Sequence, residues 1–269
     1  VIAAGATWAS EPEFKSGGVY IYRLQSNWEQ EALLAPADLP EEANFGHAVD
    51  LDGQRLIVGA PYIDESVNAQ GVVYIFADDG QWTQEARLTP GDLDVNFVGA
   101  DVAIDGDWAV IGAPRDNADG VSAGSVFIYH RNSANEWKYH SRLARATSES
   151  YSYFGNNVCV EGGTVLVGAE YSSQFGANTG AVFVYELEGN AWSQAQVLSP
   201  NDKTAWSHFG GSVSIRNGIA AIGSYGHPNS TGSAYIFERD KTGQFIQINH
   251  LLSSDGGQRD RFGNDVAVG

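Results

Sequence analysis

The sequence lacks several features on which common protein classes depend. Its 269 residues include one cysteine and no methionine, and they contain no run of 18 or more apolar residues. A single cysteine, Cys159, excludes a disulfide within the chain, and the absence of a long apolar run excludes a conventional transmembrane helix. No segment shows the 3.6-residue apolar period of an amphipathic helix. The expected class is therefore an all-β protein.

Basic residues are also scarce. The chain has 15 lysine and arginine residues against 33 aspartate and glutamate residues, so its formal net charge is −18. Because binding of phosphate groups depends on lysine and arginine, this balance argues against nucleic acid and anionic lipid surfaces as partners. It is compatible with cation association, with a saline habitat or with solubility alone.

What the sequence does contain is a repeated unit, seen most clearly from Phe45 to Phe76. Apolar residues alternate at Val49 and Leu51, and Asp52-Gly53 marks a tight turn. Two further apolar runs follow, and an alternating segment from Trp82 to Leu88 completes the unit. This pattern predicts a four-stranded antiparallel sheet. A single such sheet has two apolar faces, so copies of it are expected to pack against each other.

Five copies follow one another at intervals of 53 to 56 residues. The glycine of the second strand recurs at Gly5, Gly59, Gly112, Gly168 and Gly223. The opening Phe-Gly recurs at residues 45, 154, 209 and 262, with Val98-Gly99 as a variant. The third strand begins at Gly17, Gly71, Gly124, Gly180 and Gly232, and the fourth opens on Trp28, Trp82, Trp137, Trp192 and Phe245.

The order Phe-Gly, then Gly-Ala-Pro fourteen residues later, then Gly-x-Val-Tyr-Ile-Phe resembles the FG-GAP repeat, and the resemblance covers the whole chain. That family builds the β-propeller head of integrin α chains and many secreted propellers, including lectins. The resemblance therefore implies a β-propeller. It implies fold more than function, because propellers host adhesion, sugar binding and enzymes.

The two ends of the chain complement each other in the repeat pattern. Val1 to Ala6 corresponds to a second strand without a first, and Phe262 to Gly269 corresponds to a first strand with no second strand after it. We expect a single domain, residues 1–269, that forms a five-bladed β-propeller of four-stranded antiparallel blades. Its ring would be closed by pairing the C-terminal inner strand with the N-terminal strands, which removes exposed sheet edges. The alternative is an excerpt from a longer array.

The resemblance also raises the question of calcium. FG-GAP blades that bind calcium carry an Asp-x-Asp-x-Asp-Gly loop between the first and second strands, where carboxylates and carbonyls surround the ion. Here that connection is a two-residue hairpin in every complete copy, as at Asp52-Gly53, so the family's calcium sites are not carried over and no cofactor is expected. Two acidic loops, Asp92–Asp94 and Asp116–Asp119, are expected to be solvated turns with at most weak calcium affinity.

The longest connections follow the second and fourth strands, and they are expected on one face of the propeller. Long loops on a rigid scaffold are where binding usually resides. Aromatic rings beside Asn, Asp and Ser are typical of sugar sites, because a ring stacks on sugar C–H groups while polar side chains bind hydroxyls. The candidate ligand-binding residues in these loops are Trp8, Tyr62, Arg115, Tyr171, Tyr225 and Trp206. Phe14, Phe175, Tyr151, Tyr153 and His208 belong to the same loops. The alternative for each aromatic is packing between neighbouring blades.

Signals of catalysis are few. Asp101 and Asp265 occupy equivalent positions on first strands and could face a common channel as an acid–base pair, which keeps a glycoside hydrolase as the less favoured alternative. The six histidines show no metal-binding spacing such as His-Glu-x-x-His. Cys159 is expected to fill a crowded inner strand as a small apolar residue. No catalytic residue is predicted.

These observations predict an extracellular, secreted or surface-displayed recognition module without enzymatic activity. Its partner is expected to be a carbohydrate, as for a lectin, or a surface protein recognised in adhesion. The alternative from another class is a structural subunit of an extracellular filament or a larger adhesin. One acceptor sequon, Asn229-Ser230-Thr231, predicts possible N-glycosylation of Asn229 in a eukaryotic host.

Overall fold

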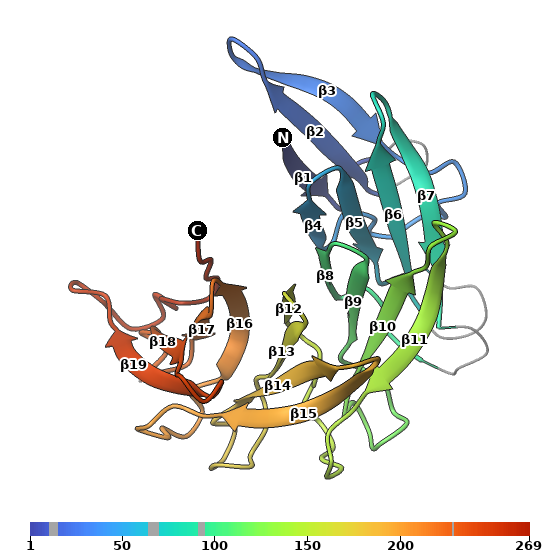
Figure 1. Cartoon of the computed structure of the whole chain (residues 1–269). Coiled ribbons are helices and arrows are strands. Elements are labelled where there is room, and N and C mark those ends of the chain that lie inside the picture. The colour runs from blue at the N-terminus through green and yellow to red at the C-terminus, as the bar shows by residue number, and fades with distance from the viewer. Residues whose placement is uncertain (11–15, 64–69, 91–94, 228) are drawn as a thin grey trace. The chain divides into compact units, whose positions relative to one another are not determined.

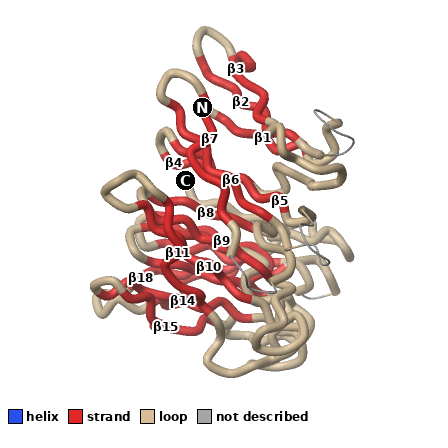
Figure 2. The backbone as a smooth tube through the Cα atoms, turned by 90° about the vertical axis from the view of Figure 1, so that its right-hand side faces the viewer, coloured by secondary structure: helices blue, strands red, loops and turns tan. Residues whose placement is uncertain are grey.

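Every regular element in the described part of the chain is a β-strand. The computed structural model describes residues 1–10, 16–63, 70–90, 95–227 and 229–269. Figure 2 shows strands and loops and no helix among them. No described segment therefore offers a helix of the length and apolar character needed to cross a membrane. The predicted all-β class is confirmed.

The strands form five antiparallel sheets built from consecutive strands, which are distributed over two compact units. The first unit comprises Val1–Asp116 and Phe127–Arg142, and the second comprises Asn117–Val126 and Leu143–Gly269. The up-and-down strand order within each sheet is that of a propeller blade.

The first unit holds one three-stranded and one four-stranded sheet and nearly all of a second four-stranded sheet, drawn from blue to green in Figure 1. Their strands are β1 (Ile2–Ala6), β2 (Gly18–Leu24) and β3 (Trp28–Leu34); β4 (Val49–Asp52), β5 (Arg55–Ala60), β6 (Val72–Asp78) and β7 (Trp82–Leu88); and β8 (Asp101–Asp105), β9 (Trp108–Ala113), β10 (Ser125–Arg131) and β11 (Trp137–Leu143).

The second unit holds two four-stranded sheets, drawn from yellow to red in Figure 1. Their strands are β12 (Val158–Glu161), β13 (Thr164–Ala169), β14 (Ala181–Glu188) and β15 (Ala191–Leu198); and β16 (Phe209–Arg216), β17 (Ile219–Ser224), β18 (Ser233–Arg239) and β19 (Phe245–Leu251).

The first and second strands of each four-stranded sheet are joined by a two-residue hairpin, as predicted. Asp52 pairs with Arg55, and Gly53 between them has a φ of 58°. Asn217 and Gly218 both have positive φ between the paired residues Arg216 and Ile219. Such backbone values are typical of the primed turns that match the twist of a hairpin. The connection is too short to surround an ion.

The recurring glycine of the second strand is required by close contact with the next sheet. A Cβ atom on Gly59 would lie 2.1 Å from the carbonyl oxygen of Gly99, and one on Gly168 would lie 2.2 Å from that of Gly210. Real Cβ atoms do not approach a backbone oxygen so closely, so each site excludes a side chain. The sequence period thus reflects the distance of closest approach between neighbouring sheets.

The recurring phenylalanine forms the core between neighbouring sheets. Phe45, Phe154 and Phe209 are fully buried. Phe45 packs edge-on against Tyr74 at 5.4 Å between ring centroids, and Phe209 packs in the same way against Tyr235. Such edge-to-face pairs add to the stabilisation from apolar burial. The first-strand residues Val102, Val158 and Val213 are buried too and add to this apolar packing.

The C-terminal segment differs from its prediction as a first strand. Phe262 makes a single parallel bridge to Gly232, and no strand follows it. The segment lies along β16 instead, where the amides of Val266 and Val268 donate to the hydroxyls of Ser212 and Ser214. A strand needs backbone partners along its length, and none of the described strands pairs with this segment. The sheet of β1, β2 and β3 accordingly has three strands.

Candidate functional site

The loops at one end of the second unit enclose a pocket of about 870 Å³. Its walls come from the loop after β13, the loop between β15 and β16, and the loop after β17. The C-terminal segment completes it. The side chains that line it include Asn156, Glu170, Tyr171, Trp206, Tyr225 and Arg261. The volume is within the range of small-molecule sites.

A ladder of side chains in ring-to-ring contact runs along the wall of this pocket. Tyr153 contacts Tyr171 with ring centroids 5.3 Å apart, and Tyr171 contacts His208 at 4.7 Å. His208 lies parallel to Tyr225 at 5.0 Å. The guanidinium of Arg261 lies 5.8 Å from the centre of the Tyr225 ring. Each ring is therefore held by its neighbours, and the pocket wall is fixed in shape.

Three members of this ladder occupy one position in the repeat, directly before the recurring phenylalanine. Tyr153, His208 and Arg261 have φ values between 52° and 55°, in the left-handed region that non-glycine residues rarely adopt. Trp206, two residues before His208, has a φ of 62°. Strained positions of this kind cost of order 1–3 kcal/mol each and cluster at binding sites. The same backbone geometry thus recurs before each of these phenylalanines, while the side chain that it carries differs from repeat to repeat.

Glu170 is the acidic group of the pocket. It is buried to 8% exposure, and it accepts hydrogen bonds from the Asn156 side-chain amide at 3.2 Å and from the Tyr225 hydroxyl. Burial raises the pKa of Glu170 to about 7, and the hydrogen bond from Tyr225 opposes this rise only in part. At neutral pH the carboxyl can therefore donate as well as accept a hydrogen bond.

The neighbouring ring groups of the pocket are held in their neutral forms. Burial lowers the pKa of the His208 imidazole, and a hydrogen bond with the Glu170 backbone opposes that change. Burial, followed by the charge of Glu170, raises the pKa of the Tyr225 hydroxyl. A neutral imidazole and a neutral phenol beside a half-protonated carboxyl suit an uncharged polar ligand better than an ion.

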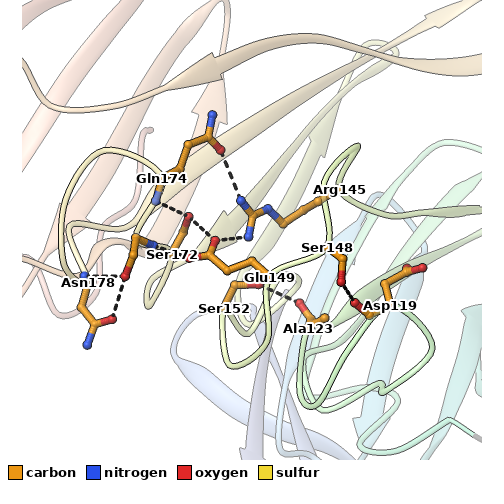
Figure 3. A network of polar contacts seen from close by, with 10 residues as sticks. Asp119, Ala123, Arg145, Ser148, Glu149, Ser152, Ser172, Gln174 and Asn178 are labelled. Atoms are coloured by element: carbon orange, nitrogen blue, oxygen red, sulfur yellow. Dashed lines mark hydrogen bonds and ion pairs between the residues drawn. The ribbon is translucent and has the colours of Figure 1, made fainter.

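A network of polar contacts fixes the loop after β13 against the segment before β12 (Figure 3). Glu149 accepts hydrogen bonds from the Ser173 amide at 2.6 Å and from the Ser172 hydroxyl at 2.9 Å, and it pairs with Arg145. Burial acts to raise the pKa of Glu149, but these donors outweigh it and keep the pKa below its ordinary value. Arg145 also lies over the Phe183 ring at 5.1 Å. The loop that carries Glu170 and Tyr171 is thereby held in place.

A second group of aromatic and cationic side chains in contact with one another lies in the first unit. Tyr62 packs edge-on against Phe97 with centroids 4.8 Å apart, and the Arg115 guanidinium lies 3.9 Å from the centre of the Phe97 ring. His47 also contacts Tyr62 edge-on, with ring centroids 6.4 Å apart. Trp8 belongs to the same unit and is 70% exposed.

Comparison with known protein families identifies the repeat. A family model described as the FG-GAP repeat matches residues 28–76, 82–129, 137–185 and 192–237, which together make up well over half of the chain. The chain belongs to the FG-GAP repeat family. A search of curated proteins found none that matches it. FG-GAP repeats occur in extracellular and adhesion-type proteins.

Each FG-GAP match begins on the aromatic that opens a fourth strand and ends in the third strand of the next sheet. The first runs from Trp28 at the start of β3 to Phe76 in β6. One FG-GAP repeat therefore links two neighbouring sheets through the chain itself. The Phe-Gly and the second-strand glycine lie in the middle of the match, where those sheets meet.

The six predicted binding residues of these FG-GAP repeats separate into two groups. Tyr171, Tyr225 and Trp206 line one pocket in the second unit, whereas Trp8, Tyr62 and Arg115 lie in the first unit. Sequence analysis did not single out Glu170, Asn156 or Arg261. Arg261 carried a signal, since it directly precedes a Phe-Gly as His208 does. Phe14 and the acidic loop Asp92–Asp94 fall outside the described residues.

The acidic residues considered for catalysis or calcium have structural partners. Asp265 accepts a hydrogen bond from the Ser212 hydroxyl at 3.1 Å. Asp101 lies in the other unit, so the proposed acid–base pair stays a prediction. Asp116 is 1% exposed and forms an ion pair with Arg142 at 3.2 Å, which corrects its prediction as a solvated turn residue. Cys159 packs at the edge of the core, which agrees with its predicted apolar role.

Proposed function

We propose that the chain is an extracellular recognition module without enzymatic activity, and that the pocket of the second unit binds a neutral carbohydrate. The observation that carries this proposal is the convergence of Trp206, Tyr225 and the buried Glu170 on one pocket. Trp206 is 60% exposed and offers a ring face for stacking on sugar C–H groups. Occurrence of FG-GAP repeats in extracellular and adhesion-type proteins supports the location.

Polar groups around these rings match the needs of sugar hydroxyls. Glu170, Asn156 and Asn264 combine acceptors and donors along the pocket, and Ser230 adds a hydroxyl. Sugar hydroxyls donate and accept at the same oxygen, so mixed neighbours of this kind satisfy them when water is displaced. A site of this composition needs no metal or cofactor to bind a sugar.

Glu170 also gives a hydrolase one supporting observation, because a carboxyl with a pKa of about 7 is suited to acid–base catalysis. Glycoside hydrolysis ordinarily uses two carboxyl groups on opposite sides of the scissile bond. Glu170 is the sole carboxylate among the described residues that line the pocket. Binding without turnover is therefore the better supported function.

The proposal is tested by a glycan array followed by calorimetric titration of the sugar that binds. Trp206→Ala is expected to weaken binding by at least tenfold, because stacking surface is lost while the exposed side chain contributes little to folding. Trp28→Ala is the matched control, since Trp28 is also exposed and lies on β3 of the first unit. Equal binding by wild type and Trp206→Ala would reject this pocket as the sugar site. A blank array with folded protein would favour the structural-subunit alternative.

We further propose that the repeats form a closed five-bladed ring. The sheet of β1, β2 and β3 lacks the inner strand that each other sheet has, and residues 263–269 form no strand of their own. Pairing of the C-terminal segment with β1 would give this sheet its inner strand and would give residues 263–269 a strand to pair with. It would also cover an edge that otherwise presents free backbone groups.

A further inference from the structure

Asp202, His227 and His250 come together in the second unit from three different elements. Asp202 lies in the loop after β15, His227 in the loop after β17, and His250 on β19. One ligand atom of each lies within 4.8 Å of those of the other two. The Nε2 atom of His227 is 2.8 Å from a carboxylate oxygen of Asp202.

Tyr235 fixes the arrangement of these three side chains. It pairs with His250 across β18 and β19, and the two rings stack with centroids 4.3 Å apart. Its hydroxyl donates to the carboxylate of Asp202, with distances of 3.1 and 3.0 Å to the two oxygens. The cluster is thus built on a paired strand position, which is more rigid than a loop alone.

The equivalent place in the first unit contains an arginine instead. Arg87, like His250, precedes the leucine that ends a fourth strand. It lies over Tyr74, which has the position of Tyr235. Its partner Asp38, 3.4 Å away, has the position of Asp202. A carboxylate is therefore balanced there by a permanent positive charge.

Two other repeats show the same balance of charges. Arg142, also at the position of His250, pairs with Asp116, which has the position of His227. In the sheet of β12 to β15 the position of His250 is held by Val197, and the guanidinium over Phe183 comes instead from Arg145, before β12, which pairs with Glu149. Only among β16 to β19 do two histidines stand in place of the arginine within the described four-stranded sheets.

In the sheet of β16 to β19, the Asp202 carboxylate has imidazole nitrogens beside it in place of a guanidinium. The Nδ1 atom of His227 and the Nε2 atom of His250 are buried and have no hydrogen-bond partner among the described residues. Buried polar atoms in proteins usually have a partner, which can be a protein group, a water molecule or an ion.

We propose that Asp202, His227 and His250 bind a divalent transition metal ion, for which Zn²⁺ is the test ion. Two imidazole nitrogens and one carboxylate oxygen form a ligand set typical of zinc, whereas calcium takes oxygen ligands. Zinc bonds of about 2.0–2.2 Å place tetrahedral ligand atoms roughly 3.3 Å apart, so the three side chains need small movements. Asp202 is partly exposed, which leaves access for the ion and a water as fourth ligand.

The ion would replace the arginine as the positive charge of this repeat. It would tie the loop between β15 and β16 and the loop after β17 to strand β19, and both loops border the pocket. The site is separate in its residues from the sugar pocket and does not depend on that proposal.

The experiment is a calorimetric titration of the chelator-treated full chain with Zn²⁺ at pH 7.5, repeated with Ca²⁺. Wild type is expected to bind one Zn²⁺ and to melt at a higher temperature with it. His250→Phe, which keeps a ring on Tyr235, and Asp202→Asn are each expected to weaken binding by at least tenfold. His140→Phe is the matched control, since His140 lies on β11 outside the cluster.

Two results would overturn the proposal. One is the absence of saturable Zn²⁺ binding by wild type. The other is unchanged affinity in either His250→Phe or Asp202→Asn while the protein remains folded. If His250→Phe fails to fold, Asp202→Asn decides, because Asp202 is partly exposed and its loss is not expected to unfold the chain. A tetrahedral absorption spectrum with Co²⁺, lost in Asp202→Asn, would add support from a measurement independent of affinity.

Discussion

Glu170 is the residue for which burial has the clearest measurable consequence. Its pKa is about 7 in the folded protein against an ordinary value near 4.5. Below pH 4.5 the carboxyl is protonated in both states. Between pH 4.5 and 7 the unfolded chain ionises while the folded protein keeps its proton, so stability falls as pH rises, by roughly 3 kcal/mol in total. Above pH 7 the loss is complete.

Glu170→Gln is therefore expected to raise the free energy of unfolding at pH 8 by about 2–3 kcal/mol and to change it little at pH 4.5. Glutamine keeps an oxygen for Asn156 and Tyr225 but cannot ionise. Urea unfolding at both pH values measures the difference, and Glu238→Gln, at an exposed position of β18, serves as the control. An equal effect of Glu170→Gln at the two pH values would show that ionisation of Glu170 is not its cause.

For single residues, the sequence predicted which types of side chain line a binding pocket better than it predicted which residues those side chains contact. Tyr171, Tyr225 and Trp206 were chosen because aromatic rings in long loops favour binding, and the structure brings these three together. Glu170 was not chosen, because its importance comes from burial by other repeats, which a local pattern does not contain. Asp116 was misinterpreted for the same reason, since its partner Arg142 follows 26 residues later.

Within the strands, the recurring glycine of the second strand is the position that tolerates a side chain least. Gly59 has ordinary backbone angles, so steric contact alone excludes a side chain there. Gly59→Ala is expected to cost about 1–3 kcal/mol or more, because the new methyl group would overlap the Gly99 carbonyl. Gly18→Ala is the matched control on β2. Its nearest neighbour would be the movable end of Leu33, at 3.1 Å. Thermal or urea unfolding compares the two, and equal costs would contradict the steric explanation.

Strand positions were predictable because the same pattern of residues recurs in five copies along the chain. The period of 2 in the apolar residues, the turn at Asp52-Gly53 and the glycine before each third strand agree with the observed bounds of β4, β5 and β6. The C-terminal strand was the exception. Its sequence matches a first strand from Phe262 onward, but a strand forms only where a paired neighbour supplies hydrogen bonds, and sequence pattern does not establish that neighbour.

For the whole molecule, ring closure is the prediction that matters most, because five repeats can also form an open array. Closure with the register of β4 and β5 places Ala267 opposite Ala3, as Asp50 lies opposite Ile57. Paired residues in antiparallel strands have Cα atoms about 4.5–5.5 Å apart, which suits a disulfide. Replacement of Cys159 by serine, the residue at the equivalent Ser214, removes the native thiol.

Ala3→Cys with Ala267→Cys in that background is expected to form an intramolecular disulfide under mild oxidation, seen as a mass loss of two hydrogens in the monomer. The bond should raise the melting temperature, because it closes nearly the whole chain into one loop. Ala3→Cys with Asn264→Cys is the control, since three residues of strand displace the second thiol by about 10 Å. Disulfide formation in the control alone, or in neither variant, would contradict closure in this register. Formation in the first variant alone would show that the two ends meet as neighbouring strands, as a five-bladed ring requires.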